Sequence, residues 1–190
     1  LACGGGGSSA TGQTTPPPAT DESWTILVYT ALDNDLDNMA MERLNRLENR
    51  PYDTACTIVT QMDTKTERLF GSVSAKRILV VPDGVDGLTQ SVESSLISDL
   101  GEQDMSAPSV LQSFMEWGIA NYPADHYLVI LASHGDQYLG FCREETGASS
   151  STMKPGEVAS ALSNALDTHS LDSFDGLLYN ACLMGGMEPV

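Results

Sequence analysis

Two side chains in this sequence have the chemistry of a cysteine hydrolase: the imidazole of His134 and the thiol of Cys182. Hydrolysis of a peptide bond by cysteine requires a thiolate nucleophile, an imidazole that transfers protons, and N–H donors that stabilise the oxyanion. His134 is followed by Gly135, and a glycine lets a backbone N–H approach a substrate closely. A single cysteine or histidine is usually structural, so their positions in the fold decide whether they form a pair.

Short apolar runs that are typical of buried strands precede both residues. Residues 126–132 (HYLVILA) end just before His134, and residues 174–179 (FDGLLY) end just before Cys182. The other strands that we expect are residues 24–30 and 55–61, with a hairpin of residues 67–71 and 76–81. The expected helices are residues 33–49, 106–122 and 156–169, and residues 135–155 are expected to form a long loop.

This alternation of strands and helices predicts an α/β fold, a mainly parallel sheet with helices on both faces. Ligands bind beyond the carboxyl ends of the strands in such sheets, and His134 and Cys182 both follow those ends. We therefore expect the two side chains to meet at one edge. Residues 184–190 resemble the first turn of another helix, so we expect the domain to continue with further strands that this chain lacks.

The remaining cysteines fit the nucleophile role less well. Cys56 lies inside an expected strand, where a thiol is usually a small buried hydrophobe. Cys142 lies in the loop after His134, a position that can be open to solvent, but its neighbours match no nucleophile motif.

The first 22 residues are expected to form a flexible tether, and residues 23–190 the folded domain. Leu1-Ala2-Cys3 stands before a run of glycines and resembles the end of a bacterial lipoprotein signal, in which the cysteine carries the lipid. A lipid on Cys3 would hold the protein at the cell envelope. The other interpretation is an ordinary cysteine near a frayed terminus.

The negative charge of the chain restricts the kinds of molecule that it can bind. Nine basic and 26 acidic residues give a formal net charge of −17. This charge argues against binding to nucleic acid and against electrostatic docking on anionic lipid, so membrane contact would come only through the anchor at Cys3. An acidic surface favours solubility, and it would also favour a cationic substrate.

Three stretches occur in a fixed order along the folded part. They are residues 24–29 (WTILVY) with residues 33–36 (DNDL), His134-Gly135, and residues 181–185 (ACLMG). Together they resemble the motifs of the clostripain family of cysteine peptidases. The resemblance implies a caspase-like α/β fold and cleavage after Arg or Lys. It also implies Cys182 as the nucleophile, His134 as the acid/base that protonates the leaving amine, and the N–H groups of Gly135 and Cys182 as the oxyanion hole.

Two features of this family bear on substrate and processing. Asn180 stands where the family typically has an Asp that receives the basic side chain of the substrate, and an amide supplies no countercharge. Asn180 is thus a candidate substrate-binding residue that leaves the specificity for Arg or Lys open. Members are often cut between the His and Cys motifs, which makes Arg143 and Lys154 candidate autoprocessing sites. Arg143 is the better candidate because Pro155 follows Lys154, and the alternative is an ordinary mobile loop.

Ca²⁺ is the one cofactor that the resemblance leaves open, because some members of the family need it. Asp33, Asp35 and Asp37 alternate as in an EF-hand. The sixth position is Asn38 and the twelfth is Leu44, so that motif fails. The acidic residues instead suit the first turn of a helix, and any Ca²⁺ site would be of a different kind.

The sequence is therefore compatible with two functions from different classes. The first is a cysteine endopeptidase acting on a peptide or protein. The second is a catalytically inactive, lipid-anchored binding or scaffold protein with the same fold, which Asn180 favours and the intact His134 and Cys182 pair disfavours. A third hypothesis, an enzyme that acts on small molecules, is not supported by any phosphate-binding glycine motif in the sequence.

Overall fold

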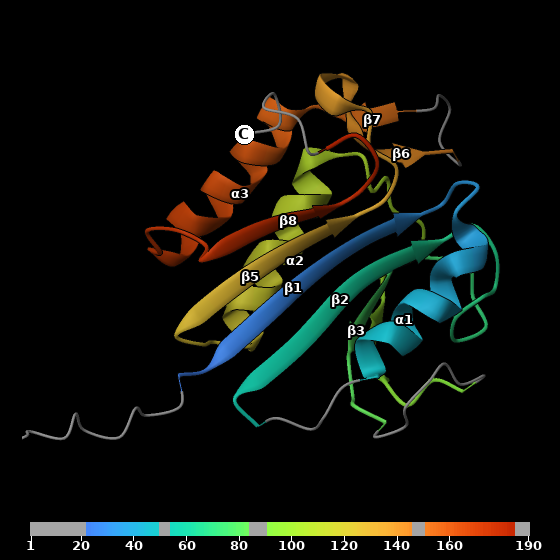
Figure 1. The fold of residues 1–190 in the computed structure, drawn as a ribbon, viewed down its shortest axis with the longest axis horizontal. Coiled ribbons are helices and arrows are strands. Elements are labelled where there is room, and N and C mark those ends of the chain that lie inside the picture. Colours follow the sequence, from blue (N-terminus) through green and yellow to red (C-terminus); the bar gives the residue numbers. More distant parts are fainter. Residues whose placement is uncertain (1–21, 50–53, 84–90, 146–150, 185–190) are drawn as a thin grey trace, which may run out of the picture.

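The computed structural model describes residues 22–49, 54–83, 91–145 and 151–184, which form a sheet with helices on both faces (Figure 1). Its strand order is β4-β3-β2-β1-β5-β8, in which β3 is Lys76–Leu79 and β4 is Ser95–Asp99. Four of the strands are parallel to one another: β1 (Trp24–Leu32), β2 (Cys56–Thr64), β5 (His126–Ala132) and β8 (Gly176–Asn180). This arrangement confirms the predicted α/β fold with a mainly parallel sheet.

Alternate residues of β1 explain why it lies inside the sheet. Leu27, Tyr29 and Ala31 belong to an apolar cluster with α2 (Pro108–Asn121) and α3 (Pro155–His169). Val28 and Leu32 belong to a second cluster with α1 (Ala40–Glu48). Both faces of β1 are covered, which is why its sequence is an almost continuous apolar run.

The edge beyond β2 differs from the prediction. Residues 67–71 do not form a strand. The predicted strand of residues 76–81 is confirmed as β3 (Lys76–Leu79), but it pairs antiparallel with β2 and with β4 (Ser95–Asp99), so the predicted hairpin with residues 67–71 is wrong. The sequence of β4, SLISD, is short and mostly exposed, and it carries little of the apolar signal that marks a buried strand.

Two other segments, one predicted as a single helix and one as a loop, each consist of several shorter elements. The predicted helix of residues 33–49 begins as a turn, continues as the short 3-10 helix η1 (Asp37–Met39), and becomes α-helical only in α1. The predicted loop of residues 135–155 contains η2 (Gln137–Leu139) and an antiparallel pair, β6 (Phe141–Glu144) and β7 (Ser151–Met153). Both segments lie next to the C-terminal ends of the parallel strands, where the site is expected (Figure 1).

The expected tether of residues 1–22, with Cys3, lies outside the described residues except for its last position, and so do residues 185–190. In the described ranges, none of the helices has both the length and the apolar character needed to span a membrane.

Candidate active site

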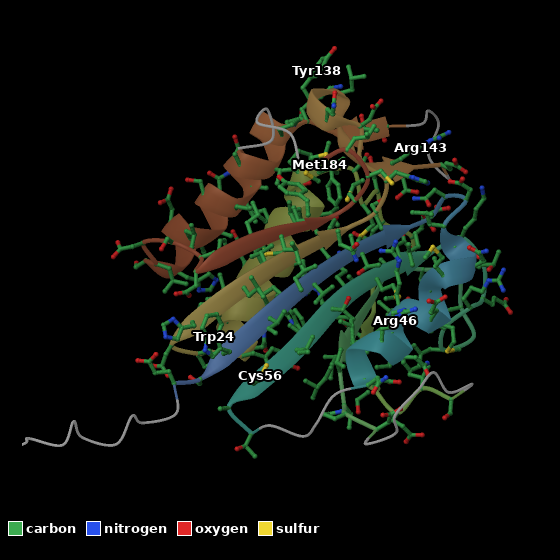
Figure 2. All side chains as sticks on the ribbon, in the orientation of Figure 1. Trp24, Arg46, Cys56, Tyr138, Arg143 and Met184 are labelled. Atoms are coloured by element: carbon green, nitrogen blue, oxygen red, sulfur yellow. The ribbon has the colours of Figure 1, made fainter. Side chains whose placement is uncertain are left out.

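The register of β5 and β8 brings the two predicted catalytic positions to the same end of the sheet, beyond the C-terminal ends of these strands. Ala132 pairs with Asn180 at the C-terminal ends of these neighbouring parallel strands. His134 and Cys182 each lie two residues beyond that pair. In Figure 2 the labelled Met184 and Tyr138, which follow Cys182 and His134 in the chain, lie at this end, and Trp24 and Cys56 lie at the other.

Gly135 packs directly on the segment that carries Cys182. A Cβ placed on Gly135 would lie 2.5 Å from Cγ of Met184 and 2.6 Å from the carbonyl oxygen of Cys182. The second contact is with backbone, so a change of rotamer would not relieve it. Glycine is therefore required at this position, and the backbones after β5 and β8 lie in close contact.

The loop after His134 folds back on itself. The N–H of Cys142 donates to the carbonyl of His134 at 3.2 Å, and the N–H of Asp136 donates to the carbonyl of Gly140 at 2.9 Å. Gly140 has φ of 151°, and a Cβ there would lie 2.4 Å from Oγ1 of Thr152 on β7. These contacts hold the backbone around His134 against β6 and β7.

Asp35 is a partner of His134 that the sequence did not indicate. Its Oδ1 lies 2.6 Å from Nε2 of His134, and both side chains reach solvent. The hydrogen bond to His134 lowers the pKa of the Asp35 carboxyl. Because β1 pairs with β5, residues that follow β1 were candidates to meet His134, and this neighbourhood was the available signal.

A cavity of about 330 Å³ adjoins these groups. The described residues that line it are His134, Gly135, Asp136, Gly140, Arg143, Thr152 and Leu183. Neither Cys182 nor Asn180 lines it, although Leu183 adjoins Cys182. The cavity thus gives the imidazole a concave surface of a size typical for small ligands or a side chain.

The three described cysteines are unpaired and differ in exposure. Cys182 is exposed, Cys56 is half-buried at the start of β2, and Cys142 is fully buried on β6. Cys142 is therefore closed to solvent, because the segment that was expected to be a loop forms a strand whose Phe141 and Cys142 belong to the apolar cluster. Burial raises the pKa of the Cys142 thiol well above its ordinary value, and the Glu144 carboxylate adds to the effect. Of the three, Cys182 has the exposure that a nucleophile needs.

A sequence model of the clostripain family matches residues 28–190. This chain belongs to the clostripain family. It is 26% identical over 186 residues to clostripain of Hathewaya histolytica, a match that covers 86% of the chain and 34% of that protein. The chain therefore spans about a third of the length of this relative.

Solved structures of clostripain-family proteins share the fold. A secreted C11 cysteine protease from Bacteroides thetaiotaomicron, in complex with an irreversible peptide inhibitor, matches with a TM-score of 0.69 and 26% identity, over 89% of this chain and 45% of that one. An inactive zymogen C11 protease from Parabacteroides distasonis matches with a TM-score of 0.62 and 20% identity, over 86% and 43%. These likenesses confirm the caspase-like α/β fold expected from the family resemblance.

Other family positions predicted from sequence lie at the same sheet end. Asn180 is the last residue of β8 and is exposed. Arg143 lies on β6, lines the cavity, and forms an ion pair with Glu145 at 3.2 Å. Lys154 precedes α3, and its ammonium donates to the carbonyl of Leu139. Neither basic residue therefore lies in an open loop, and residues 146–150 between them are outside the described part.

The three aspartates that suggested an EF-hand have three different surroundings. Asp35 contacts His134, Asp37 accepts hydrogen bonds from Thr66 and Arg68, and Asp33 joins a separate group of carboxylates. Such a division agrees with the failure of the motif in the sequence, because an EF-hand loop directs its ligands to one ion.

A group of four carboxylates is the arrangement among the described residues that could hold a metal ion. It consists of Asp33, Asp63, Glu102 and Glu144, each with an oxygen within 4.8 Å of the others. Burial raises the pKa of Asp63 to about 8, and the charge of Glu102 adds to this rise. Burial also raises the pKa of Glu144 to about 8, and a hydrogen bond with the Asp33 side chain is the next cause of this rise. One member of the group, Asp33, lies two residues before Asp35 in the chain.

Proposed function

We propose that the protein containing this chain is a cysteine endopeptidase of the clostripain type, with Cys182 as the nucleophile and His134 as the acid/base. The observation that carries the proposal is the matched position of the two residues, each two residues beyond the Ala132–Asn180 pair. The exposure of the Cys182 thiol supports the same role.

Each catalytic role follows from the chemistry of the reaction. The Cys182 thiolate attacks the carbonyl carbon of the peptide bond, and a tetrahedral oxyanion forms. The N–H groups of Gly135 and Cys182 are the proposed donors to that oxyanion, and the close packing of the Gly135 and Cys182 backbones supports their acting together. His134 then protonates the leaving amine, which leaves an acyl-enzyme for water to hydrolyse.

Asp35 is proposed as the residue that positions His134. If Nε2 carries a proton, the Asp35 carboxylate accepts it in a hydrogen bond at 2.6 Å, and Nδ1 is left to exchange a proton with the reacting groups. The carboxylate also stabilises the imidazolium that forms during the reaction. Asp35 acts through the imidazole and has no proposed contact with the substrate.

Asn180 is the proposed substrate-binding residue, and cleavage after Arg or Lys is the proposed specificity. Its exposed position at the end of β8, two residues before Cys182, supports contact with the substrate residue before the cut bond. Its amide accepts a hydrogen bond from a guanidinium but supplies no negative charge. Arg143 and Lys154 remain the proposed processing sites, with Arg143 preferred because Pro155 follows Lys154.

The cellular location and the binding partners of the protein are also proposed from the sequence. We propose a cell-envelope or secreted bacterial protein that acts on peptides or proteins and meets the membrane through a lipid on Cys3. One relative that shares the fold, from Bacteroides thetaiotaomicron, is described as secreted. Detection of the lipidated peptide by mass spectrometry would test the anchor.

The test of the main proposal is a cleavage assay on the full-length protein. A peptide library randomised at the residue before the cut bond would be compared for wild-type protein, Cys182→Ala and Cys56→Ala. Cys56 is a matched control because it is also an unpaired cysteine but lies at the opposite end of the sheet (Figure 2). We expect cleavage after Arg or Lys by wild-type protein and Cys56→Ala, and none by Cys182→Ala.

The second candidate function is a catalytically inactive binding protein, favoured by Asn180 and by a cavity whose lining lacks Cys182. A thiol-reactive peptide probe separates the two. In a peptidase the probe labels Cys182, and His134→Ala greatly reduces labelling because the thiolate loses its imidazole. Absence of labelling and of cleavage in folded wild-type protein would favour the binding protein.

A further inference from the structure

The cavity beside His134 lies on one side of the proposed reaction centre. Its described lining includes His134 and Gly135 but neither Cys182 nor Asn180. Asn180 ends β8 and is the proposed contact for the substrate residue before the cut bond. In the proposed mechanism His134 protonates the leaving amine, so the imidazole faces the substrate residue that carries this amine. The cavity therefore lies on the side of the residue after the cut bond.

The described walls of this cavity come from separate segments of the chain, and one of them is apolar. The loop after β5 contributes Asp136 and Gly140, β6 contributes Arg143, β7 contributes Thr152, and Leu183 follows β8. Leu183 is 60% exposed in the described part of the chain, and its φ is 60°. A left-handed backbone is uncommon for leucine, and such conformations concentrate at active sites and ligand contacts. An apolar side chain held open to solvent in this way suits contact with an apolar part of a substrate.

The two charged side chains at the cavity differ in their partners. Arg143, labelled in Figure 2, forms an ion pair with Glu145 at 3.2 Å, and its charge also acts on the Asp35 carboxylate. Asp136 is exposed, and none of the ion pairs found in the described ranges includes it. Asp136 therefore leaves a negative charge at the cavity that a basic group of a ligand can neutralise.

We propose that the cavity binds the side chain of the substrate residue after the cut bond, and that it prefers Arg or Lys there. These side chains have an apolar stem and a cationic head. Leu183 contacts the stem and Asp136 pairs with the head, and a cavity of about 330 Å³ has room for either side chain. The formal net charge of −17 also favours cationic substrates. This inference rests on the proposed peptidase function and adds a second specificity position to that of Asn180.

The candidate processing sites do not have the preferred residue at this position. Glu144 follows Arg143, and Pro155 follows Lys154, so neither bond is followed by a basic residue. Glutamate would place a second negative charge beside Asp136, and proline has no cationic head. A cut at Arg143 within one molecule would depend on proximity instead of on this subsite. Peptides with two successive basic residues should therefore be cut faster than a peptide that copies the sequence around Arg143.

Cleavage of matched peptides by the full-length protein tests the subsite. The residue before the cut bond is the one that wild-type protein prefers, and the residue after it is Lys, Glu or norleucine, which has the stem of Lys without its charge. We expect kcat/KM for Lys to exceed that for norleucine about three- to tenfold, and that for Glu to be the lowest. Asp136→Asn should remove the preference for Lys over norleucine, and Asp136→Lys should make Glu the preferred residue. Asp172→Asn is the matched control: Asp172 is also exposed but lies between α3 and the start of β8, at the other end of the sheet, so the preference should stay.

The outcomes are separable. Equal kcat/KM values for the three peptides overturn the subsite and leave the peptidase proposal in place, whereas no cleavage of any peptide overturns the proposed function and the subsite with it. A preference for Lys that survives in folded Asp136→Asn overturns the role of Asp136.

The turn at Asp136 should survive both substitutions, because its main-chain N–H donates to the carbonyl of Gly140 at 2.9 Å. If thermal unfolding shows that neither variant folds, the salt dependence of wild-type protein decides. The preference for Lys over norleucine should fall as NaCl is added, because salt screens an exposed ion pair. A preference that is insensitive to salt overturns the pairing with Asp136.

Discussion

Asp35 provides a way to separate positioning of His134 from binding of the substrate. In the full-length protein, Asp35→Asn should lower kcat for peptide cleavage about ten- to hundredfold, because a misplaced imidazole transfers protons poorly. KM should change little, since Asp35 has no proposed contact with the substrate. Steady-state kinetics would measure both constants. Partial recovery by Asp35→Glu would show that the carboxylate itself matters.

The control for this prediction is Glu42→Gln. Glu42 is also an exposed carboxylate, but it pairs with Arg46 one turn away on α1. Its substitution should leave kcat and KM unchanged. A folded Asp35→Asn variant that cleaves as fast as wild type would show that the 2.6 Å contact has no role in the reaction.

The residue scale also shows what the sequence could predict. Glycine at 135 and the matched positions of His134 and Cys182 follow from local motifs and the ends of apolar runs. The contact of Asp35 with His134 and the grouping of Asp33, Asp63, Glu102 and Glu144 do not. The residues in each case lie on separate segments of the chain, and the strand order decides which segments meet. The burial of Cys142 was missed for a similar reason: β6 is short, and its apolar residues are too few to mark it as a strand.

At the scale of elements, His126 joins the N-terminal ends of three strands. Nδ1 lies 2.8 Å from Asp175, just before β8, and Nε2 lies 2.7 Å from Glu22, just before β1. Hydrogen bonds to Asp175, and then to Glu22, raise the pKa of His126 above its ordinary value of 6.5. The protonated imidazole therefore stabilises the folded state.

The sign of the pH dependence follows from this raised pKa. The contribution of His126 is fully present below its unfolded pKa, near 6.5, and is lost as pH rises through the higher folded pKa. The difference in thermal midpoint between wild type and His126→Gln should thus be largest below pH 6.5 and shrink at higher pH. A part that does not vary with pH should remain, because the His126 ring also stacks on Trp24 at 4.6 Å.

Glu22→Gln serves as the control for this pH effect. It removes one of the two carboxylates and keeps the stacking on Trp24, so it should reduce the part of the His126 contribution that depends on pH. Thermal unfolding of the full-length protein from pH 5 to pH 9 would measure each difference. A difference that grows with pH would contradict the assigned charge of His126.

Elements were predicted best where burial is greatest. The four parallel strands were found from the sequence because each contains a run of apolar residues covered on at least one face. At the antiparallel edge, β3 was located but its partner β4 was not, because β4 is short and mostly exposed, and the bulge between Arg77 and Ile78 breaks the regular pairing of the two strands. Helices α2 and α3 were located to within about two residues, since Pro108 and Pro155 mark their first turns.

At the scale of the molecule, one face of the sheet is unevenly covered. Helix α1 packs over β1, β2 and β3, but in the described part of the chain no helix covers this face over β5 and β8 (Figure 1). Ile130 of β5 pairs with Leu178 of β8 on this face, and Leu178 is 52% exposed. Leu177, on the opposite face, is 44% exposed. Apolar side chains exposed on both faces of one strand are the basis for the prediction that further elements cover it.

This coverage can be tested by substitution in the full-length protein, given that the chain spans 45% of its structural relative from Bacteroides thetaiotaomicron. If another element covers β8, Leu178→Ala should lower the free energy of unfolding by about 2–4 kcal/mol, as expected for a buried leucine. Leu139→Ala is the matched control: Leu139 has a similar exposure of 47% but lies on η2, away from the strand edge, and its substitution should cost no more than about 0.5 kcal/mol. Denaturant unfolding would measure both. Equal, small effects would mean that β8 stays uncovered, and the expectation of further strands beside Cys182 would then be wrong.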